Sequence, residues 1–243
     1  MKRAKEVSVT TAQPKRLRRA PTDPFVGVNA KTDDEFVRDH VQPSDGWTSW
    51  EHPKTQEKCE VALKRSAALS AVELDACFDL IVRTSADAYR ASAAGWRPEA
   101  KREEMHSTDL RYILVKNHHG ELRAFASFMP TFEEGEPVVY CYEIHLEDEL
   151  HGTGLARQLM GMLESVARHT PPITKVMLTC YTSNMRARAF YTKLGFVTDA
   201  ISPQERRLRR GVVFMPDYLI MSLRVRGETA EEEPLTKDTP PPN

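Results

Sequence analysis

Apolar and polar residues alternate with a changing period along the chain from residue 58 onward. In "KCEVALK", Cys59, Val61 and Leu63 alternate with polar residues, which is typical of a half-buried strand. Residues 70–89 instead repeat their apolar residues at helical spacing, behind a Ser and a Glu three residues apart, which predicts a capped helix. The runs "RYILVK" and "ELRAFASFMP" on either side of the turn "NHHG" predict a hairpin.

The second half of the chain repeats a strand-then-helix order. After the turn "EEGE", residues 138–147 read as a strand, and residues 154–169 place their apolar residues on one helical face. "TKVMLTCY" predicts another strand, "SNMRARAFYTKL" a helix that ends at Gly195, and "DYLIMSLRV" a last strand. We therefore expect one α/β domain over about residues 55–226, with a mixed central sheet flanked by helices.

The segments outside this domain differ in composition. Residues 1–21 are basic, with seven Lys and Arg against one Glu in the first twenty, and residues 227–243 are acidic and Pro-rich; both ends are expected to be disordered. Residues 22–54 contain Phe25, Phe36, Trp47 and Trp50 and are expected to pack on the domain. "PKRLRRA" is open to three interpretations: a solvated arm, a nuclear-import signal or an arm that binds a polyanion.

Composition excludes several classes of protein. No apolar run approaches the roughly 18 residues of a membrane span, and the first residues lack the apolar core of a secretory signal. The four cysteines are scattered without a C-x-x-C pair, so reduced structural thiols are favoured over a zinc site. We expect a soluble intracellular protein that needs no metal and no membrane.

The stretch "HGTGLA", residues 151–156, joins a predicted strand to a predicted helix through small residues. Exposed N–H groups and the positive end of the helix dipole make such a turn an anion site, and glycines let a diphosphate approach the backbone. The stretch lacks both the G-x-G-x-x-G pattern and the P-loop pattern. Taken alone, a pair of glycines at such a junction is more often a plain turn than an anion site.

Two motifs together resemble the GNAT acetyltransferases. "HGTGLA" resembles their motif A, Gln/Arg-x-x-Gly-x-Gly/Ala, through His151, Gly154 and Ala156, although His151 stands where the family has Gln or Arg. About 30 residues later, "SNMRARAFYTKLGF" resembles the second half of the same fold, through Asn184, Ala189, Tyr191 and Leu194-Gly195-Phe196. The resemblance implies the GNAT acyl-CoA N-acyltransferase fold, with acetyl-CoA as co-substrate.

In that family the backbone of the loop holds the pyrophosphate of coenzyme A. The resemblance implies that the cofactor contacts come from the end of the strand, the loop and the helix start, and from Asn184, which touches the pantetheine or caps its own helix. The residues implied are Ile144, His145, Leu146, His151, Gly152, Thr153, Gly154, Leu155, Ala156 and Asn184.

Three further stretches, "GWRPEAKREEM", "YCYEIHLE" and "KVMLT", resemble the NatD group of N-terminal acetyltransferases. That group acts on histones whose mature chains begin Ser-Gly-Arg-Gly (the H-four and H-two-A types). The resemblance, over about residues 61–202, implies acetyl transfer to the α-amino group of such a chain. It also implies histone tails as partners and a location in nucleus and cytoplasm, while the basic arm permits a ribosome or nucleosome contact. Two alternatives stay open: a GNAT acetyltransferase for a lysine side chain or small amine, and a non-catalytic protein that binds acetyl-CoA or a histone tail.

The reaction defines which groups are useful as catalysts. An N-terminal ammonium with a pKa near 8 must lose a proton before it attacks a thioester, so a carboxylate within reach is useful. Glu143 matches the base proposed for the family, and Tyr140 and Tyr142 resemble its peptide-binding tyrosines, Tyr142 being a catalytic candidate as well. Strict strand alternation would put Glu143 on the face opposite both tyrosines, so either a bulge re-aims a residue or their roles differ. Tyr191 is either the proton donor to the leaving thiolate or a packing residue.

The predicted peptide site uses residues from the first long helix and the hairpin. Tyr89 matches a substrate contact of the family, and Trp96, which follows it in "GW", is a further candidate; alternatively, both hold the helix against the sheet. Ala94 stands where the family usually has Trp. Thr131 stands where the family has an acidic residue that grips the substrate Arg, whereas Glu133 is kept, in an acidic turn that suits an ammonium and an Arg.

Overall fold

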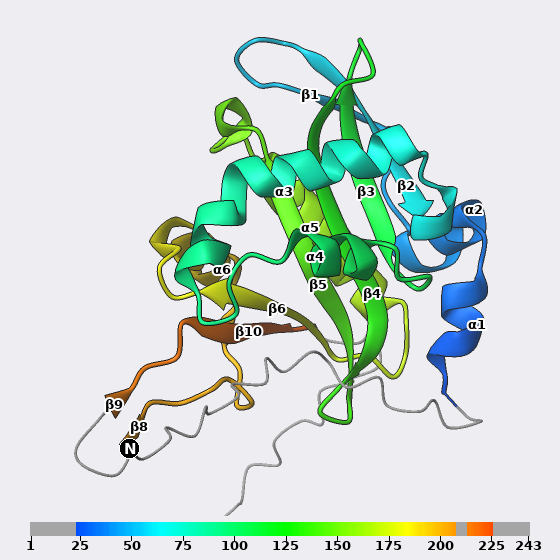
Figure 1. Cartoon of the computed structure of the whole chain (residues 1–243). Helices are drawn as coiled ribbons and strands as arrows, with labels where there is room; N and C mark the ends of the chain where they lie inside the picture. Colours follow the sequence, from blue (N-terminus) through cyan, green and yellow to red (C-terminus); the bar gives the residue numbers. More distant parts are fainter. Residues whose placement is uncertain (1–22, 208–212, 226–243) are drawn as a thin grey trace, which may run out of the picture.

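The fold is built on one eight-stranded sheet. The computed structural model describes residues 23–207 and 213–225, so the basic arm and the acidic tail lie outside the described residues. The strand order is β1-β2-β3-β4-β5-β6-β10-β7 (Figure 1), and a separate short pair joins β8 to β9. The strands are β1 Ser49–Glu51, β2 Lys58–Arg65, β3 Arg111–Asn117, β4 Leu122–Glu133, β5 Glu136–Leu146, β6 Lys175–Tyr181, β7 Val197–Thr198, β8 Arg206–Arg207, β9 Val213–Phe214 and β10 Tyr218–Arg224.

Helices cover both faces of this sheet. They are α1 Phe25–Ala30, α2 Asp33–Phe36, the π-helix η1 Val37–Val41, the 3-10 turns η2 Ser66–Ala68 and η3 Asp148–Leu150, α3 Ala71–Ala91, α4 Pro98–Met105, α5 Leu155–Arg168 and α6 Met185–Leu194. Figure 1 shows α3 across the near side of the sheet and α5 behind it. The mixed α/β architecture predicted from the sequence is confirmed.

The helix and strand predictions are confirmed wherever the period was clear. The capping box at the start of α3 is present, with Ser70 accepting from the Glu73 N–H and Glu73 from the Ser70 N–H. Gly195 ends α6 with φ 96°, a conformation that favours glycine. The sequence analysis missed α4, which begins at Pro98, and the short strands β1 and β7.

The pairing of β5 with β6 is parallel and short. It joins Val138–Cys141 to Lys175–Leu178, and the other pairings of the sheet are antiparallel. The last residues of β5 and β6 therefore extend past the paired part, at the carboxyl ends where α/β sheets place their ligand sites.

Two apolar cores lie on opposite faces of the sheet. The larger core joins α5, α6 and the N-terminal segment to one face, and includes Phe36, Cys141, Leu155 and Tyr191. The smaller core joins α3 and α4 to the other face, and includes Phe78. The four cysteines are free and buried, as the sequence analysis expected of structural thiols.

The N-terminal segment is fastened by a buried arginine. The Arg111 side chain is 1% exposed, bonds Asp33 at 2.9 Å and the Lys31 carbonyl at 2.7 Å, and lies 3.9 Å above the ring of Phe36. A buried guanidinium needs such partners because desolvation of an unpaired charge is costly. Burial, only partly offset by Asp33, lowers the pKa of Arg111 to about 10. Residues 25–41 are thus part of the folded core.

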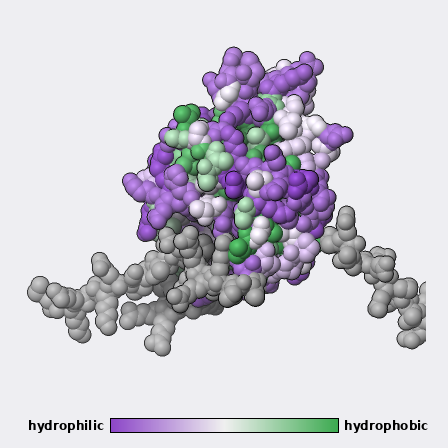
Figure 2. All heavy atoms as spheres, turned by 90° about the vertical axis from the view of Figure 1, so that its right-hand side faces the viewer, coloured by the Kyte–Doolittle hydropathy of each residue, from purple (hydrophilic) through white to green (hydrophobic). Residues whose placement is uncertain are grey.

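Hydrophilic residues cover most of the side of the molecule formed by β2 and the N-terminal helices. Figure 2 shows this side, where apolar residues gather in a few separate places. Among the described residues, Val26 at 49% and Val72 at 79% are exposed apolar side chains.

The buried Phe36 gives a stability test of the N-terminal segment. Phe36→Ala should lower the free energy of unfolding by about 3–5 kcal/mol, because it removes a fully buried ring and leaves a cavity. The exposed Val26→Ala in the same segment should change it by less than about 0.5 kcal/mol. Urea unfolding followed by fluorescence measures both, and equally small losses would show that this segment does not belong to the cooperative core.

Candidate functional site

A bulge in β5 determines which side chains share the site. Along the β4–β5 pairing, Phe128 lies opposite Cys141 while the adjacent Ser127 lies opposite Glu143, so Tyr142 is an extra residue in β5. The bulge turns Glu143 to the face that carries Tyr142, toward α3 and α4, and leaves Cys141 in the opposite core. Of the two possibilities left open by the sequence, the bulge is the one that the structure contains.

Glu143 is the centre of a buried network. Its carboxylate is 8% exposed; Oε1 accepts from the Tyr89 hydroxyl at 2.9 Å and from the Lys101 ammonium at 2.7 Å. Oε2 lies 2.5 Å from Nε2 of His145, and Nδ1 of His145 lies 2.6 Å from the hydroxyl of Thr84. Residues from α3, α4 and β5 thus converge on one carboxylate.

The charges around Glu143 keep it ionised. Burial by itself raises the pKa of the Glu143 carboxyl, but Lys101 and His145 outweigh burial, and the pKa lies well below its usual range. Lys101 also bonds Glu104 at 2.6 Å, and its ammonium lies 5.2 Å from the centre of the Tyr89 ring. Burial, reinforced by the Glu143 charge, raises the pKa of Tyr89, so its hydroxyl remains a proton donor to the carboxylate.

The predicted peptide-binding aromatics form one wall of this site. The ring of Tyr89 lies 5.2 Å from that of Trp96 and 5.3 Å from that of Tyr181, and Tyr140 and Tyr142 are also 5.2 Å apart. The Tyr140 hydroxyl bonds Thr179 at 2.7 Å. Burial is the main cause that raises the pKa of Tyr140, to about 12.

The acidic residue Glu133 lies near the two strand tyrosines. Burial and then repulsion from Glu134 raise the pKa of Glu133, and the charge of Glu133 in turn contributes to the raised pKa values of Tyr140 and Tyr142. Thr131 lies two residues earlier in β4 and so shares the face of Glu133. Both are half-buried, which leaves them accessible from solvent.

The acidic turn itself is only partly free. Glu136 pairs with Lys175 at 2.5 Å, and Lys175 also bonds the buried Asp199 at 2.9 Å. Glu134, in the turn with φ 47°, is exposed. The acidic rim predicted from sequence is therefore carried by Glu133 and Glu134.

The loop before α5 has the geometry of an anion site. Gly152 and Gly154 have φ values of 77° and 93°, where other residues are strained, and a Cβ at either position would meet nothing within 4 Å. Gly154 is the N-cap of α5 and supplies no side-chain cap, while the Thr153 hydroxyl bonds back to the Leu150 carbonyl at 2.6 Å. The Leu155 N–H lies 3.5 Å from the Thr153 hydroxyl, and Gly154 provides no side chain to cap the N–H groups that follow in the first turn of α5.

The other residues predicted to bind the cofactor can do so through their backbone. Leu146 and Leu155 place their side chains in the larger core, with Ile144 and Ala156 packed against it. The side chain of His145 is already engaged by Glu143 and Thr84.

The two polar side chains predicted to bind the cofactor have different positions. Asn184 caps α6, with its Oδ1 accepting from the Ala187 N–H at 3.0 Å, so the capping alternative is present. His151 is half-buried, and its Nδ1 lies 3.6 Å from Asp148. Burial, followed by the charge of Arg186, lowers the pKa of His151, so this side chain tends to be neutral.

Tyr191 lies on the far side of the bulge from the Glu143 network. It is 7% exposed, in α6, with its ring 5.3 Å from Phe190 and 5.7 Å from Phe196. Burial, then the nearby Cys141 and Glu143, raise the pKa of its hydroxyl well above the usual value. A hydroxyl that stays protonated is compatible with both predicted roles, proton donor and packing.

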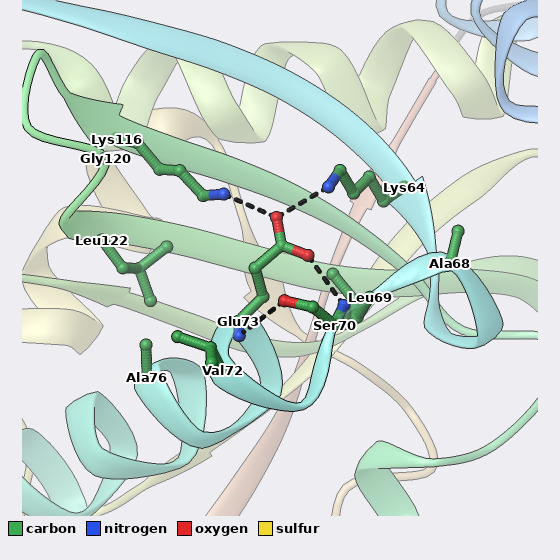
Figure 3. Close-up of a pocket in the computed structure, with 10 residues that line it drawn as sticks. All are labelled: Lys64, Ala68, Leu69, Ser70, Val72, Glu73, Ala76, Lys116, Gly120 and Leu122. Atoms are coloured by element: carbon green, nitrogen blue, oxygen red, sulfur yellow. Dashed lines mark hydrogen bonds and ion pairs between the residues drawn. The ribbon is translucent and has the colours of Figure 1, made fainter.

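A separate hollow of about 460 Å³ lies at the start of α3, away from these residues (Figure 3). Its central carboxylate, Glu73, accepts hydrogen bonds from Lys64 and Lys116 and from the Ser70 N–H. The capping box and both lysines already satisfy this carboxylate, so its role is to stabilise the start of α3. Figure 3 shows these contacts converging on Glu73.

Sequence analysis missed three residues of the Glu143 network: Lys101, Glu104 and Thr84. Lys101 and Glu104 lie within "KREEM", which was used as a motif but not assigned roles. The i, i+3 spacing of these two oppositely charged residues is visible in the sequence. The contact of Lys101 with Glu143, 42 residues later in the chain, depends on how α4 packs against the sheet. Within residues 23–207 and 213–225, no cluster of His, Cys, Asp and Glu could hold a metal and no helix could cross a membrane.

The part of the chain that carries this site matches a known protein family. Residues 78–196, from the middle of α3 to the end of α6, match the model of the acetyltransferase (GNAT) family. The fold is the GNAT N-acyltransferase fold. The match includes the bulge, the glycine loop, α5 and α6, and so includes the whole Glu143 network.

Individual relatives agree with the family match. N-alpha-acetyltransferase 40 of Saccharomyces cerevisiae is 34% identical over 154 residues, covering 54% of this chain and 53% of that protein. The 5-NmdU N-acetyltransferase of Pseudomonas phage PaMx11 is 33% identical over 85 residues, covering 35% of this chain and 56% of that protein. The chain thus spans about half the length of the curated relatives it matches. A solved acyl-CoA N-acyltransferase from Pseudomonas aeruginosa has a TM-score of 0.49 at 19% identity, covering 68% of this chain and 98% of that one. The family model describes acetyltransferases, and both curated relatives are named as N-acetyltransferases.

The open GNAT loop gives a test of cofactor binding. Gly154→Glu should weaken coenzyme A binding at least about a hundredfold, because a carboxylate about 4 Å from a phosphate at a partly buried site is repelled by several kcal/mol. Isothermal titration calorimetry measures the affinity. Gly120→Glu is the matched control, since Gly120 has φ 79° and equally open surroundings in the remote β3–β4 turn. Unchanged affinity in Gly154→Glu would remove the loop from the cofactor site.

Proposed function

We propose that this protein transfers acetyl from acetyl-CoA to the N-terminal α-amine of a protein, in the manner of the NatD group. The substrates proposed are histones that begin Ser-Gly-Arg-Gly, once the initiator Met is removed. Histone tails are then its partners, and nucleus and cytoplasm its locations. A ribosome or nucleosome contact through the basic arm stays a prediction, because that arm lies outside the described residues.

The observation that carries this proposal is the position of Glu143. An ionised, buried carboxylate lies at the end of the paired part of β5, beside two tyrosines and just before the open start of α5. An acceptor amine bound between the tyrosines and the loop would meet this carboxylate. Acetyl transfer needs the amine to be deprotonated and positioned against the thioester, and both needs are served by such a group.

Each part of the site has a role in this reaction. The N–H groups at Gly152–Ala156 would hold the diphosphate of acetyl-CoA, and Tyr191 is available as a proton donor to the leaving thiolate. Tyr89 and Tyr142 surround the amine side, with Tyr140 and Trp96 next to them.

The acidic rim supports a cationic substrate. Glu133 lies near Tyr140 and Tyr142, where it would attract the ammonium or an Arg side chain of the incoming peptide. Thr131 provides a hydroxyl in place of a carboxylate, so we assign Arg recognition to Glu133. Ala94, half-buried after α3, leaves one wall of the site without the bulk of a Trp.

The 34% identity to an N-alpha-acetyltransferase favours this function over a lysine or small-amine acetyltransferase. A second relative, matched over a shorter stretch, is named for a different acceptor. Acceptor choice is therefore the property to measure first. A non-catalytic binder is disfavoured by the retention of Glu143 in a complete hydrogen-bond network.

Two peptides that begin Ser-Gly-Arg-Gly, one with a free N-terminus and one blocked, separate the possibilities. We expect transfer only to the free peptide, at its α-amine, located by mass spectrometry. Acetylation of lysines in both peptides would favour the lysine acetyltransferase. Tight acetyl-CoA binding with no transfer to any amine would favour the non-catalytic binder.

Glu143→Gln tests the carboxylate. Turnover should fall by about 10²–10⁴-fold, the usual contribution of a general base, because an amide cannot take the proton. The affinity for acetyl-CoA should change little, since Glu143 points toward α3 and α4. Steady-state kinetics and calorimetry measure the two effects, with Glu60→Gln, at an exposed position of β2, as control. Wild-type turnover in Glu143→Gln would exclude Glu143 as the proton acceptor.

A further inference from the structure

His145 connects the buried carboxylate to the protein surface. Glu143 and His145 are 8% and 7% exposed, whereas Thr84, on the other side of the imidazole, is an exposed residue of α3. The contacts run from Glu143 Oε2 to His145 Nε2 at 2.5 Å, and from His145 Nδ1 to the Thr84 hydroxyl at 2.6 Å. An unbroken line of hydrogen bonds therefore leads from the carboxylate to solvent.

The hydrogen-bond partners of Thr84 and His145 indicate where the protons lie between Glu143 and Thr84. The Thr84 hydroxyl has one proton and lies 2.8 Å from the Leu80 carbonyl and 2.6 Å from Nδ1 of His145; when it donates to Leu80, Thr84 accepts from Nδ1–H of His145. With Nδ1 protonated, the contact between Nε2 and Glu143 Oε2 requires one proton shared by these two atoms. The arrangement is that of a carboxylate–imidazole pair that has already taken up a proton.

The other partners of Glu143 cannot receive a proton from it. Tyr89 donates its hydroxyl proton to the carboxylate, and Lys101 is a charged ammonium that is also held by Glu104. The ring of Phe125, from β4, packs 5.5 Å from the imidazole and offers no polar atom. Of the side chains described as bonding Glu143, His145 alone has two ring nitrogens, so it can accept a proton at one and release a proton at the other.

We propose that His145 takes the amine proton from Glu143 and passes a proton to solvent at Thr84. The N–H bond of the substrate ammonium breaks, its electron pair stays on the amine nitrogen, and the proton goes to Oε1 of Glu143. The carboxyl gives a proton from Oε2 to Nε2 of His145, and the Nδ1–H proton leaves to water at the Thr84 hydroxyl. Rotation of the carboxyl then brings its remaining proton from Oε1 to the side of Nε2, and exchange with water returns the imidazole from the Nε2–H to the Nδ1–H tautomer. One proton has then entered the pair and one has left, and the proton shared by Oε2 and Nε2 is restored.

This proposal rests on the proposed function, because it deals with the proton that acetyl transfer releases. His145 acts through Glu143 and is a positioning and relay residue that does not itself touch the amine. The role is separate from the predicted cofactor contact of residue 145, which uses the backbone.

The test compares proton transfer with structural support. His145→Gln can keep both hydrogen bonds but cannot carry a proton; at pH 7 its kcat should fall about tenfold or more, with the KM for acetyl-CoA and the Tm unchanged. Its turnover should then rise with the concentration of imidazole at fixed pH and ionic strength, whereas the wild type should not respond. Thr84→Val, which removes the acceptor of the Nδ1 proton, should give a smaller loss of kcat. His118→Gln, in the exposed β3–β4 turn, is the matched control and should behave as wild type.

Wild-type kcat in His145→Gln would overturn the relay. So would a loss of kcat that imidazole does not restore, because that pattern indicates support of the fold or of Glu143 geometry alone. His145→Ala, which opens space for imidazole, gives a second rescue measurement. The wild-type protein tests the proposed function separately from the relay. If the wild type acetylates a lysine or a small amine instead of an α-amine, the proposed function is wrong, and the same variants test the relay on that acceptor. A wild type that acetylates no amine would overturn both.

Discussion

The extra residue at Tyr142 is the constraint on which the site depends. In a regular strand, Glu143 would share a face with Cys141 and enter the larger core, where an ionised carboxylate has no partners. The bulge instead brings Glu143 to the α3 and α4 face, where Tyr89, Lys101 and His145 complete its hydrogen bonds. Bulges re-aim side chains and end pairing near active sites, and here the parallel pairing with β6 ends at Cys141, next to the bulge.

Because the network is buried, each of its charged groups depends on the others for stability. Glu143 is 8% exposed and the side chain of Lys101 10% exposed, so each charge is desolvated and depends on the other. Removing one partner of a buried ion pair leaves an uncompensated charge, which is usually costlier than replacing both. The helix α4 therefore contributes to the site through Lys101 although it lies outside the strand–loop–helix unit that carries the recognised motifs.

Local periodicity predicted most of the fold, because the relevant interactions are local. Alternation in β2, helical spacing behind Ser70 and the stop at Gly195 each depend on residues close in sequence. The glycine loop was predicted for the same reason, because its backbone conformation is indicated by the glycines Gly152 and Gly154 themselves. The sequence could not decide whether β5 contains a bulge, because the register depends on both paired strands and the sequence of β5 alone does not determine it.

Contacts across the chain were harder to predict. The contact of Lys101 with Glu143 and the position of Thr84 beside His145 join α3, α4 and β5, and no period in the sequence encodes them. The helix α4 was missed because its eight residues carry few apolar positions, and Pro98 at its first turn was the available signal.

The start of α5 also has a consequence for thermodynamics. A ligand that accepts hydrogen bonds from the first turn of α5 would complete N–H groups that Gly154 does not cap. A ligand that binds the folded state alone stabilises it by RT ln(1 + [L]/Kd), about 2.7 kcal/mol at a hundredfold excess over Kd. If the proposed acyl donor binds the folded protein in this way, the free energy of unfolding of the protein rises with the concentration of that donor.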